Sequence, residues 1–513
     1  MVKSCVVSGL DGQPVIVEVD VGAGLAAFDI VGLPDASIRE SRERVRSAIK
    51  NSGFDFPIRR ITVNLAPADI KKEGPSLDLP IAIGILVATG QIKMSEQLAA
   101  AAFVGELSLE GTVRAISGAL PIADSLAALS DIEALYLPEE NAAEAAISQG
   151  IAAYGVNNLA QLADVLSGEA TLEPAVTDVD ELLRADFSSD AVDMSDVLGQ
   201  QAVKRALEVA AAGAHNILLM GPPGSGKTML ARRLPTILPE MTLAESIEVT
   251  KIYSICGLLP KGQALITRRP FRAPHHGASS ASIIGGGAVP RPGEISLSSH
   301  GVLFLDEMPE FHRDVLEALR QPMEDHIVTI SRASGRVDFP ACFQLVGAMN
   351  PCPCGYYGDS RKQCTCTPHQ RNRYFQRISG PLLDRIDIQI EVPRVEYKEI
   401  SGNSQNEETS AVIRQRVQAA RQLQAQRLAG KPYATNAQMS RQDLEQYCRL
   451  DDAAAQLLAE AFRTLGMSGR GHDRILKIAR TIADLAGAET IAIDHIAEAI
   501  QFRSLDREEF NDF

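Results

Sequence analysis

No stretch of this sequence is apolar for long enough to cross a membrane. Every hydrophobic run is broken by a polar residue or glycine before the about 18 residues that a spanning helix needs. The first residues, MVKSCVVSGLDG, also lack the apolar core of a secretory signal peptide. There is no internal repeat, and 513 residues are too many for one hydrophobic core. We therefore expect a cytoplasmic protein of several domains with no membrane segment.

The negative charge of the chain is spread unevenly. Of the formal net charge of −15, residues 1–170 hold 12 Lys and Arg against 22 Asp and Glu, and residues 171–195 hold 1 against 7. The other residues are close to neutral, with 37 basic against 36 acidic side chains. A neutral domain can still concentrate arginine along one channel, so the net charge does not exclude nucleic acid as a partner.

The pattern of apolar residues predicts an α/β fold with a helical end. Strand-like runs alternate with helical periodicity in the first third, and the last hundred residues are almost wholly helical in pattern. An acidic, Pro-containing stretch separates the first third from the rest and is typical of a linker. We expect four parts: an α/β domain at 1–170, an acidic linker at 171–195, an α/β core at 196–395 and a helical region at 396–513.

The most specific motif is GPPGSGKT, which lies between the strand-like HNILLMG and a helix. Glycines at this spacing let several backbone N–H groups converge on phosphate oxygens at a helix N-terminus. The lysine would reach the β- and γ-phosphates of ATP, and the following hydroxyl would bind Mg²⁺. The expected nucleotide-binding residues are Gly221, Pro222, Pro223, Gly224, Ser225, Gly226, Lys227 and Thr228.

Two later strand-like segments end in polar side chains. GVLFLDE ends in Asp306 and Glu307, and GAMNP places Asn350 at the end of the next apolar run. Asp306 would hold Mg²⁺ through water, and Glu307 would act as general base on the attacking water. Asn350 would orient that water, although an Asn before Pro is often only a turn former.

These motifs resemble the magnesium-chelatase-like branch of the AAA+ ATPases, and specifically the YifB/ComM family. The similarity runs over nearly the whole chain and is much more specific than a phosphate loop alone. It is carried by RPFRAPHH (269–276), IGGGAVPRPGEISLSSHGVLFLDE (284–307), LRQPMED (319–325), GAMNPCPCG (347–355), LLDRIDI (382–388) and GRGHDRILKIARTIADL (469–485).

The resemblance implies further site residues and a ring. Asn350 resembles the sensor-1 residue, Arg385 the arginine finger that reaches a neighbouring subunit, and Arg470 the sensor-2 arginine, with Arg474 as its alternative. A finger that acts in trans implies an oligomer, most simply a hexamer. The family's insert before the Asp306 strand matches 265–298, and its pre-sensor hairpin matches 326–340. Such hairpins line the pore of the ring and grip nucleic acid, although 326–340 is alternatively an exposed hairpin whose charges only keep it soluble. Two arginines beside its turn would contact DNA phosphates. These are Arg332 and Arg336.

Four of the eight cysteines fall within fifteen residues, as CPC and CTC. Four thiolates on a short loop suit the tetrahedral geometry of structural zinc, and the family carries cysteine pairs just after its sensor-1 residue. Free thiols and a regulatory disulfide are the alternatives, and His369 is a substitute ligand. The expected zinc ligands are Cys352, Cys354, Cys364 and Cys366.

The first domain resembles the Lon-protease (S5-type) fold. KKEGPSLDLPIA places Ser76 at the position of the nucleophile, but Leu120 stands where the lysine base belongs, and no lysine occurs between positions 94 and 203. A serine nucleophile needs an adjacent base. We therefore expect a catalytically silent Lon-protease-like domain, followed by an AAA+ ATPase core with hairpin inserts and a C-terminal helical lid.

Two hypotheses of function remain open. One is an ATP-driven DNA motor, and ComM-type proteins imply branch migration that integrates incoming single strands during natural transformation. The other is an ATP-driven protein remodeller of the chelatase or chaperone type. The arginine hairpin and the lack of a metal-binding adhesion domain favour the motor. The acidic first third and the lack of a separate nucleic-acid module favour the remodeller. ATP, Mg²⁺ and zinc are the expected cofactors, and single-stranded and branched DNA the expected partners.

Overall fold

The computed structural model describes residues 1–69, 71–185, 192–287, 289–332, 335–359, 361–395, 407–464 and 467–503. Several stretches for which we made predictions fall outside these ranges: 186–191 of the expected linker, 288 and 333–334 of the expected hairpin segments, 360 between the cysteine pairs, and 396–406, 465–466 and 504–513 of the expected helical region. The chain forms two compact units. Unit 1 contains residues 1–186 and 242–267, and unit 2 contains residues 187–241 and 268–513. Within the described ranges, no helix has the length and hydropathy needed to cross a bilayer.

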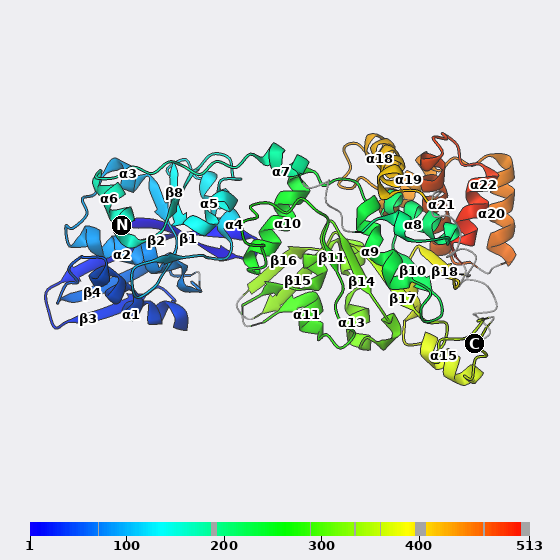
Figure 1. Cartoon of the computed structure of the whole chain (residues 1–513), viewed down its shortest axis with the longest axis horizontal. Coiled ribbons are helices and arrows are strands. Elements are labelled where there is room, and N and C mark those ends of the chain that lie inside the picture. Colours follow the sequence, from blue (N-terminus) through cyan, green and yellow to red (C-terminus); the bar gives the residue numbers. More distant parts are fainter. Residues whose placement is uncertain are drawn as a thin grey trace. The chain divides into compact units, whose positions relative to one another are not determined.

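Unit 1 is built on a mixed seven-stranded sheet of order β3-β4-β2-β1-β5-β8-β9 (Figure 1). Its strands are β1 (Val2–Ser8), β2 (Asp11–Gly22), β3 (Ala27–Val31), β4 (Arg60–Ala66), β5 (Ala101–Phe103), β8 (Ala134–Pro138) and β9 (Ala152–Val156), and β6 (Glu106–Leu107) pairs with β7 (Val113–Arg114). Its helices are α1 (Ala36–Asn51), α2 (Asp78–Ala88), α3 (Glu96–Ala99), α4 (Ala119–Ala127), α5 (Glu139–Ala145), α6 (Leu159–Ser167), α7 (Val179–Ala185) and α10 (Leu243–Ile255).

Helix α2 is the central element of unit 1. Its apolar residues are buried over nearly its whole length, so it cannot face solvent on any side. The buried carboxylate of Asp78 at its first turn accepts hydrogen bonds from Arg44 of α1 and from the backbone N–H of Leu107. These contacts satisfy a group that burial would otherwise penalise.

Two segments join unit 1 that the sequence placed elsewhere. Helix α7 lies in the expected linker, and its Leu182 and Leu183 pack against a cluster containing Leu120. Helix α10 lies in the part of the sequence expected to be ATPase core, yet Ser254 at its end donates to the buried Glu144 and accepts from the N–H of Gly118. The periodicity of α10 predicts a helix but not the unit in which it packs.

Unit 2 is built on a parallel five-stranded sheet of order β11-β14-β17-β10-β18. The strands are β10 (Ile217–Met220), β11 (Phe271–Arg272), β14 (Val302–Leu305), β17 (Gln344–Met349) and β18 (Ile388–Glu391). Two small hairpins join it, β12 (Gly285–Gly286) with β13 (Arg291–Pro292), and β15 (Ile327–Arg332) with β16 (Gly335–Pro340). The helices around the sheet are α8 (Gln201–Gly213), α9 (Lys227–Ile237), α11 (Ser280–Ile284), α12 (Glu294–Leu297), α13 (Arg313–Ala318), α14 (Pro322–Asp325), α15 (Pro368–Phe375) and α16 (Gly380–Leu383).

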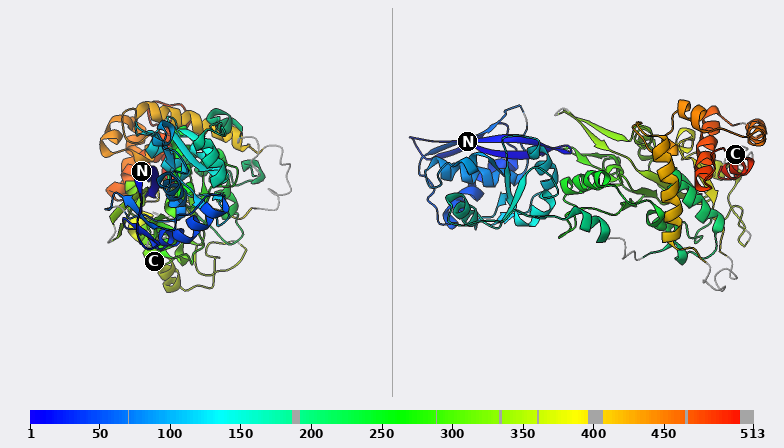
Figure 2. Two further views of the ribbon diagram at one scale, coloured as in Figure 1. Left: turned by 90° about the vertical axis from the view of Figure 1, so that its left-hand side faces the viewer. Right: turned by 90° about the horizontal axis from the view of Figure 1, so that it is seen from above.

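The C-terminal helices share the core of this sheet. They are α18 (Ser410–Arg427), α19 (Arg441–Tyr447), α20 (Asp452–Thr464), α21 (Gly469–Leu485) and α22 (Ile493–Gln501). Figure 2 shows them, orange to red, gathered together in both views. Their buried residues, such as Val417 and Ile478, belong to one hydrophobic cluster with Leu207 of α8 and Val346 of β17. The predicted helical lid is therefore packed on the α/β core, and the predicted α/β fold is confirmed.

Candidate nucleotide, metal and DNA sites

The phosphate loop joins β10 to α9, and its backbone requires glycine at three positions. Gly224 and Gly226 have φ values of +78° and +90°, a region that other residues rarely adopt. A Cβ on Gly221 would lie 2.3 Å from the carbonyl oxygen of Val392. The loop can therefore turn tightly onto the N-terminus of α9, where backbone N–H groups face an anion.

Lys227 begins α9 and folds back over the loop. Its Nζ donates to the carbonyl oxygens of Gly221 (2.7 Å) and Pro222 (3.0 Å) and to Oδ1 of Asn350 (3.2 Å). Burial lowers the pKa of Lys227 below its usual value, while the carboxylate of Asp306 opposes the shift. Phosphate oxygens could replace these neutral acceptors and would pair the ammonium group with an anion.

The parallel sheet brings the three polar strand ends together. Strand β17 lies between β10 and β14, so the phosphate loop, Asp306 and Asn350 follow neighbouring strands at one edge. Thr228 Oγ1 donates to Asp306 Oδ2 at 2.8 Å. A hydroxyl and a carboxylate at this separation suit Mg²⁺, which prefers oxygen ligands and binds proteins through one or two carboxylates.

Glu307 lies next to this edge in a left-handed backbone conformation, with φ of +51°. Its side chain is 57% exposed, and its Oε2 lies 3.6 Å from Nδ1 of His276. His276 ends the RPFRAPHH motif, but its sequence context did not mark it as a site residue. While its carboxylate is held by the imidazole of His276, Glu307 is turned away from an attacking water. His276 can therefore control the direction in which the Glu307 side chain points.

Gln200 is a second residue that the sequence did not single out. Its Nε2 donates to the carbonyl oxygens of Ser225 (2.8 Å) and Pro393 (3.0 Å). It therefore ties the phosphate loop to the segment after β18. Its φ of +53° at the start of α8 is the local signal, but no sequence pattern reports it.

The candidate arginines lie in different surroundings. Arg385 is 12% exposed, and its Nη2 lies 2.5 Å from Oε1 of Glu324 in the same chain. Arg470 is exposed in the first turn of α21. Arg474, one turn further on, lies 3.3 Å from Asp387, and burial lowers its pKa. Arg470 is thus the more accessible of the two sensor candidates.

The four clustered cysteines come together around one point. Their Sγ atoms all lie within 4.8 Å of one another, with separations of 3.3 Å for Cys352–Cys354 and 3.6 Å for both Cys352–Cys364 and Cys354–Cys364. A tetrahedral zinc–thiolate site with bonds of about 2.3 Å has edges of about 3.8 Å. Although burial opposes it, backbone N–H groups lower the pKa of Cys354 to about 6, which favours the thiolate, while burial raises the pKa of Cys352. The cluster therefore fits a metal held by Cys352, Cys354, Cys364 and Cys366.

The two arginines expected to contact DNA lie on the β15–β16 hairpin and are exposed. Arg336 lies beside Asp338, with Nε to Oδ1 at 3.2 Å. Arg332 extends over the β12–β13 hairpin, because the Nη2 of Arg332 would lie 3.3 Å from a Cβ placed on Gly286 of β12. The two hairpins of unit 2 therefore meet at Arg332.

The protease-like features of unit 1 do not form a serine–lysine pair. Leu120 is fully buried in α4. Lys72 is buried too, and its Nζ donates to the carbonyl oxygen of Pro67. Burial lowers the pKa of Lys72, but among the described residues no hydrogen bond joins Lys72 to Ser76. Ser76 thus has no lysine among these residues to activate it.

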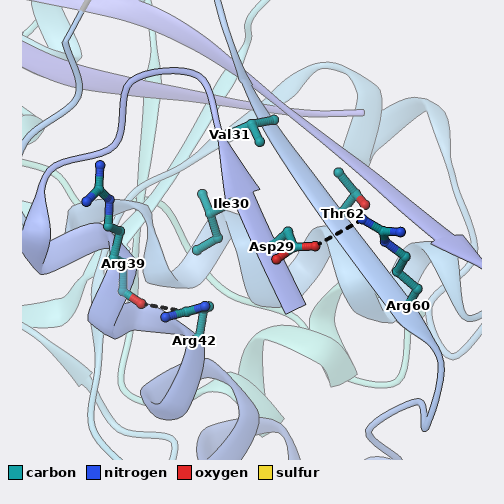
Figure 3. Close-up of a pocket in the computed structure, with 7 residues that line it drawn as sticks. All are labelled: Asp29, Ile30, Val31, Arg39, Arg42, Arg60 and Thr62. Atoms are coloured by element: carbon teal, nitrogen blue, oxygen red, sulfur yellow. Dashed lines mark hydrogen bonds and ion pairs between the residues drawn. The ribbon is translucent and has the colours of Figure 1, made fainter. Parts of the chain in front are cut away.

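Unit 1 also contains a pocket of about 330 Å³ beside the edge strand β3 (Figure 3). The residues that line it are Asp29, Ile30, Val31, Arg39, Arg42, Arg60 and Thr62. Arg60 pairs with Asp29 at 3.4 Å, and Arg42 donates to the carbonyl oxygen of Arg39. The one carboxylate of the lining, that of Asp29, is paired with Arg60, so we assign the pocket no reaction.

Comparison with known proteins assigns the family. A model described as magnesium chelatase, subunit ChlI, matches residues 193–400. Models described as subunit ChlI of Mg-chelatase and as magnesium chelatase, subunit ChlI C-terminal, match residues 17–141 and 407–503. The chain is 45% identical to the competence protein ComM of Haemophilus influenzae over 97% of this chain and 96% of that protein. It is 42% identical to YifB of Escherichia coli over the same shares. It is 25% identical to the magnesium-chelatase 38 kDa subunit of Rhodobacter capsulatus over 59% of this chain and 83% of that one. With such identity over nearly the full length, the chain belongs to the ComM/YifB family of magnesium-chelatase-like AAA+ proteins.

Proposed function

We propose that this protein is an ATPase that forms a hexameric ring and moves along DNA, driving branch migration during recombination. The observation that carries the proposal is the meeting of Lys227, the Thr228–Asp306 pair and Asn350 at one edge of a parallel sheet. This constellation serves phosphoryl transfer, in which positioning and charge stabilisation account for most of the catalysis.

Each residue of the site has one task in this proposal. Lys227 leaves its carbonyl acceptors for the β- and γ-phosphates, and Thr228 and Asp306 hold Mg²⁺. Glu307 accepts the proton of the attacking water, and Asn350 orients that water. Bound ATP supplies the phosphoanhydride bond whose hydrolysis drives the motor.

Arg385 and Arg470 complete the site at a subunit boundary. Arg385 would exchange Glu324 for the γ-phosphate of a neighbouring subunit, where it stabilises the charge that develops in the transition state. Arg470 is exposed on the lid. It would contact the phosphates of the ATP bound either to its own chain or to the neighbouring chain. Both roles depend on a ring.

DNA is the proposed substrate of the motion. The exposed Arg332 and Arg336 would contact phosphates of single-stranded and branched DNA. A relative that is 45% identical is named a competence protein. We extend this to the chain as a role in integrating incoming DNA during natural transformation, which takes place in the cytoplasm.

The cysteine cluster would hold one structural zinc ion. Four thiolates leave no open position for a substrate, so the metal would stiffen the loop that follows Asn350. Because Lys227 contacts Asn350, the shape of this loop also bears on the nucleotide site.

A protein remodeller is the second candidate. Helix α10 follows α9 in the chain, yet it packs in the acidic unit 1, where Ser254 contacts Glu144. An acidic unit tied in this way to the ATPase chain could carry a basic protein partner instead of serving DNA.

The test is the ATPase rate of the purified protein with single-stranded, duplex and branched DNA. We expect DNA to stimulate hydrolysis, and Arg332→Glu/Arg336→Glu to lose that stimulation. The control is Arg441→Glu/Arg463→Glu, a matched charge reversal on exposed lid residues. Hydrolysis that no DNA alters, in a protein that binds none, would refute the motor and favour the remodeller.

A further inference from the structure

The loop between the two cysteine pairs is a short, basic and aromatic segment. Its nine residues, 355–363, read GYYGDSRKQ, and helix α15 follows directly after the second pair. Residues 352–378 contain five Lys and Arg against one Asp, in a chain with a net charge of −15. Figure 1 shows α15 at the rim of the strands and helices of unit 2. The proposed nucleotide site does not use these side chains.

A cation lies over each tyrosine ring of this loop, one from the loop itself and one from α15. Lys362 Nζ lies 4.0 Å from the ring centroid of Tyr356, and the guanidinium carbon of Arg371 lies 4.3 Å from that of Tyr357. These are cation–π distances. A flat ring flanked by cations is also the arrangement that receives an unpaired base and its phosphate.

The single acidic residue of the loop does not neutralise its cations. Asp359 Oδ2 lies 2.7 Å from Nε of Arg394, and its Oδ1 accepts from the backbone N–H groups of Arg361 and Lys362. In the part of the chain that the structure describes, neither Arg361 nor Lys362 pairs its side chain with a carboxylate, and both are exposed. Two positive charges are therefore available to an anion.

The cysteine cluster brings both ends of the loop together, and a metal held by its four thiolates would fix them there. Cys352 and Cys354 before the loop lie within 3.6 Å of Cys364 after it, measured between Sγ atoms. A loop fixed at both ends has little conformational entropy left to lose when it meets a ligand. The surface is thus organised before the ligand arrives.

We propose that residues 355–359 and 361–363 form a binding surface for single-stranded DNA, in which Arg361 and Lys362 contact phosphates and Tyr357 stacks on a base. An aromatic face can meet only an unpaired base, so the surface selects single strands over intact duplex. This inference rests on the proposed function, but it concerns a contact separate from Arg332 and Arg336.

The absence of tryptophan from the sequence provides a clean probe. Tyr357→Trp would introduce the one tryptophan of the protein, in the full-length chain. We expect its emission to be quenched when an oligo-dT strand is added, and to change much less with a blunt duplex. Tyr447→Trp, on lid helix α19, is the matched control and should not respond to either.

Charge reversal supplies a second, independent readout. Each phosphate contact to a single strand contributes about 0.7 to the slope of log affinity against log salt concentration. We expect Arg361→Glu/Lys362→Glu to lower that slope by about 1.4 for oligo-dT. The lid variant Arg441→Glu/Arg463→Glu should keep the slope of the wild type.

The outcomes separate this inference from the proposed function. If the wild type binds no DNA of any form, both fail together. The other outcome is a wild type that binds oligo-dT, a salt-dependence slope that is the same in the loop and lid charge variants, and a Tyr357→Trp emission that oligo-dT does not change. That outcome refutes the loop surface but leaves the motor standing.

Discussion

Removing metal from the cysteine cluster is a perturbation whose size follows from the structure. Metal ligation by Cys352, Cys354, Cys364 and Cys366 would cross-link a segment of fifteen residues. Closing a loop of that length is worth about 3 kcal/mol, which is a factor of about 100 in the population of the closed loop. Spread over a unit of roughly 300 residues, a loss of about 3 kcal/mol lowers Tm by about 5 °C.

The assay is zinc content by mass spectrometry, combined with thermal unfolding with and without a chelator. We expect one zinc ion per chain, a large loss of zinc in Cys354→Ser and Cys366→Ser, and a lower Tm after chelation. Cys448→Ala is the control, because Cys448 is buried in the lid away from the cluster and should leave the zinc content unchanged. A wild type that was purified with zinc under reducing conditions, holds none and shows the same Tm with chelator would refute the reasoning.

Three further predictions concern unit 2. Arg385→Ala frees Glu324 and should lower kcat by about 10³ with little change in ATP affinity. If the finger acts in trans, mixing the Arg385→Ala protein with the Glu307→Gln protein should restore activity, because an intact Glu307 of one subunit then meets an intact Arg385 of its neighbour. His276→Ala should raise the basal ATPase rate by up to about fivefold, since an exposed pair holding Glu307 is worth at most about 1 kcal/mol; an unchanged rate would remove His276 from the account. Although burial opposes it, hydrogen bonds from neighbouring hydroxyl groups lower the pKa of Asp443, so its stabilisation is fully present above the unfolded-state pKa of about 3.9 and is lost progressively as pH falls from there through the lower folded-state pKa. Asp443→Asn should therefore cost about 2 kcal/mol of unfolding free energy at pH 7, measured by denaturant titration, and progressively less as pH falls below 4.

The local features of the site were readable from the sequence because their causes are local. Positive φ at Gly224 and Gly226 follows from the motif itself, and the apolar runs before Asp306 and Asn350 predict buried strands. In a parallel sheet the carboxyl ends of the strands lie at the same edge. Once the strand order is known, the proximity of the phosphate loop, Asp306 and Asn350 therefore follows. The helices of the C-terminal region followed from their periodicity in the same way.

The partners of the site residues were not readable, because they depend on segments far apart in the chain. The contact of His276 with Glu307 spans an insertion of thirty residues, and that of Arg385 with Glu324 spans sixty. No period or motif encodes such pairs. Helix α10 is the clearest case, since its sequence predicts a helix, while only the fold shows that it packs against α4 of unit 1.

The most direct test of the central claim is strand movement on a branched DNA substrate by the wild type and by Glu307→Gln, with ATP and Mg²⁺. The account predicts ATP-dependent movement by the wild type, and binding without movement by Glu307→Gln, because that variant keeps the nucleotide and DNA contacts and loses only the general base. Movement by Glu307→Gln at the wild-type rate, or none by a wild type that hydrolyses ATP and binds the branched DNA, would contradict it.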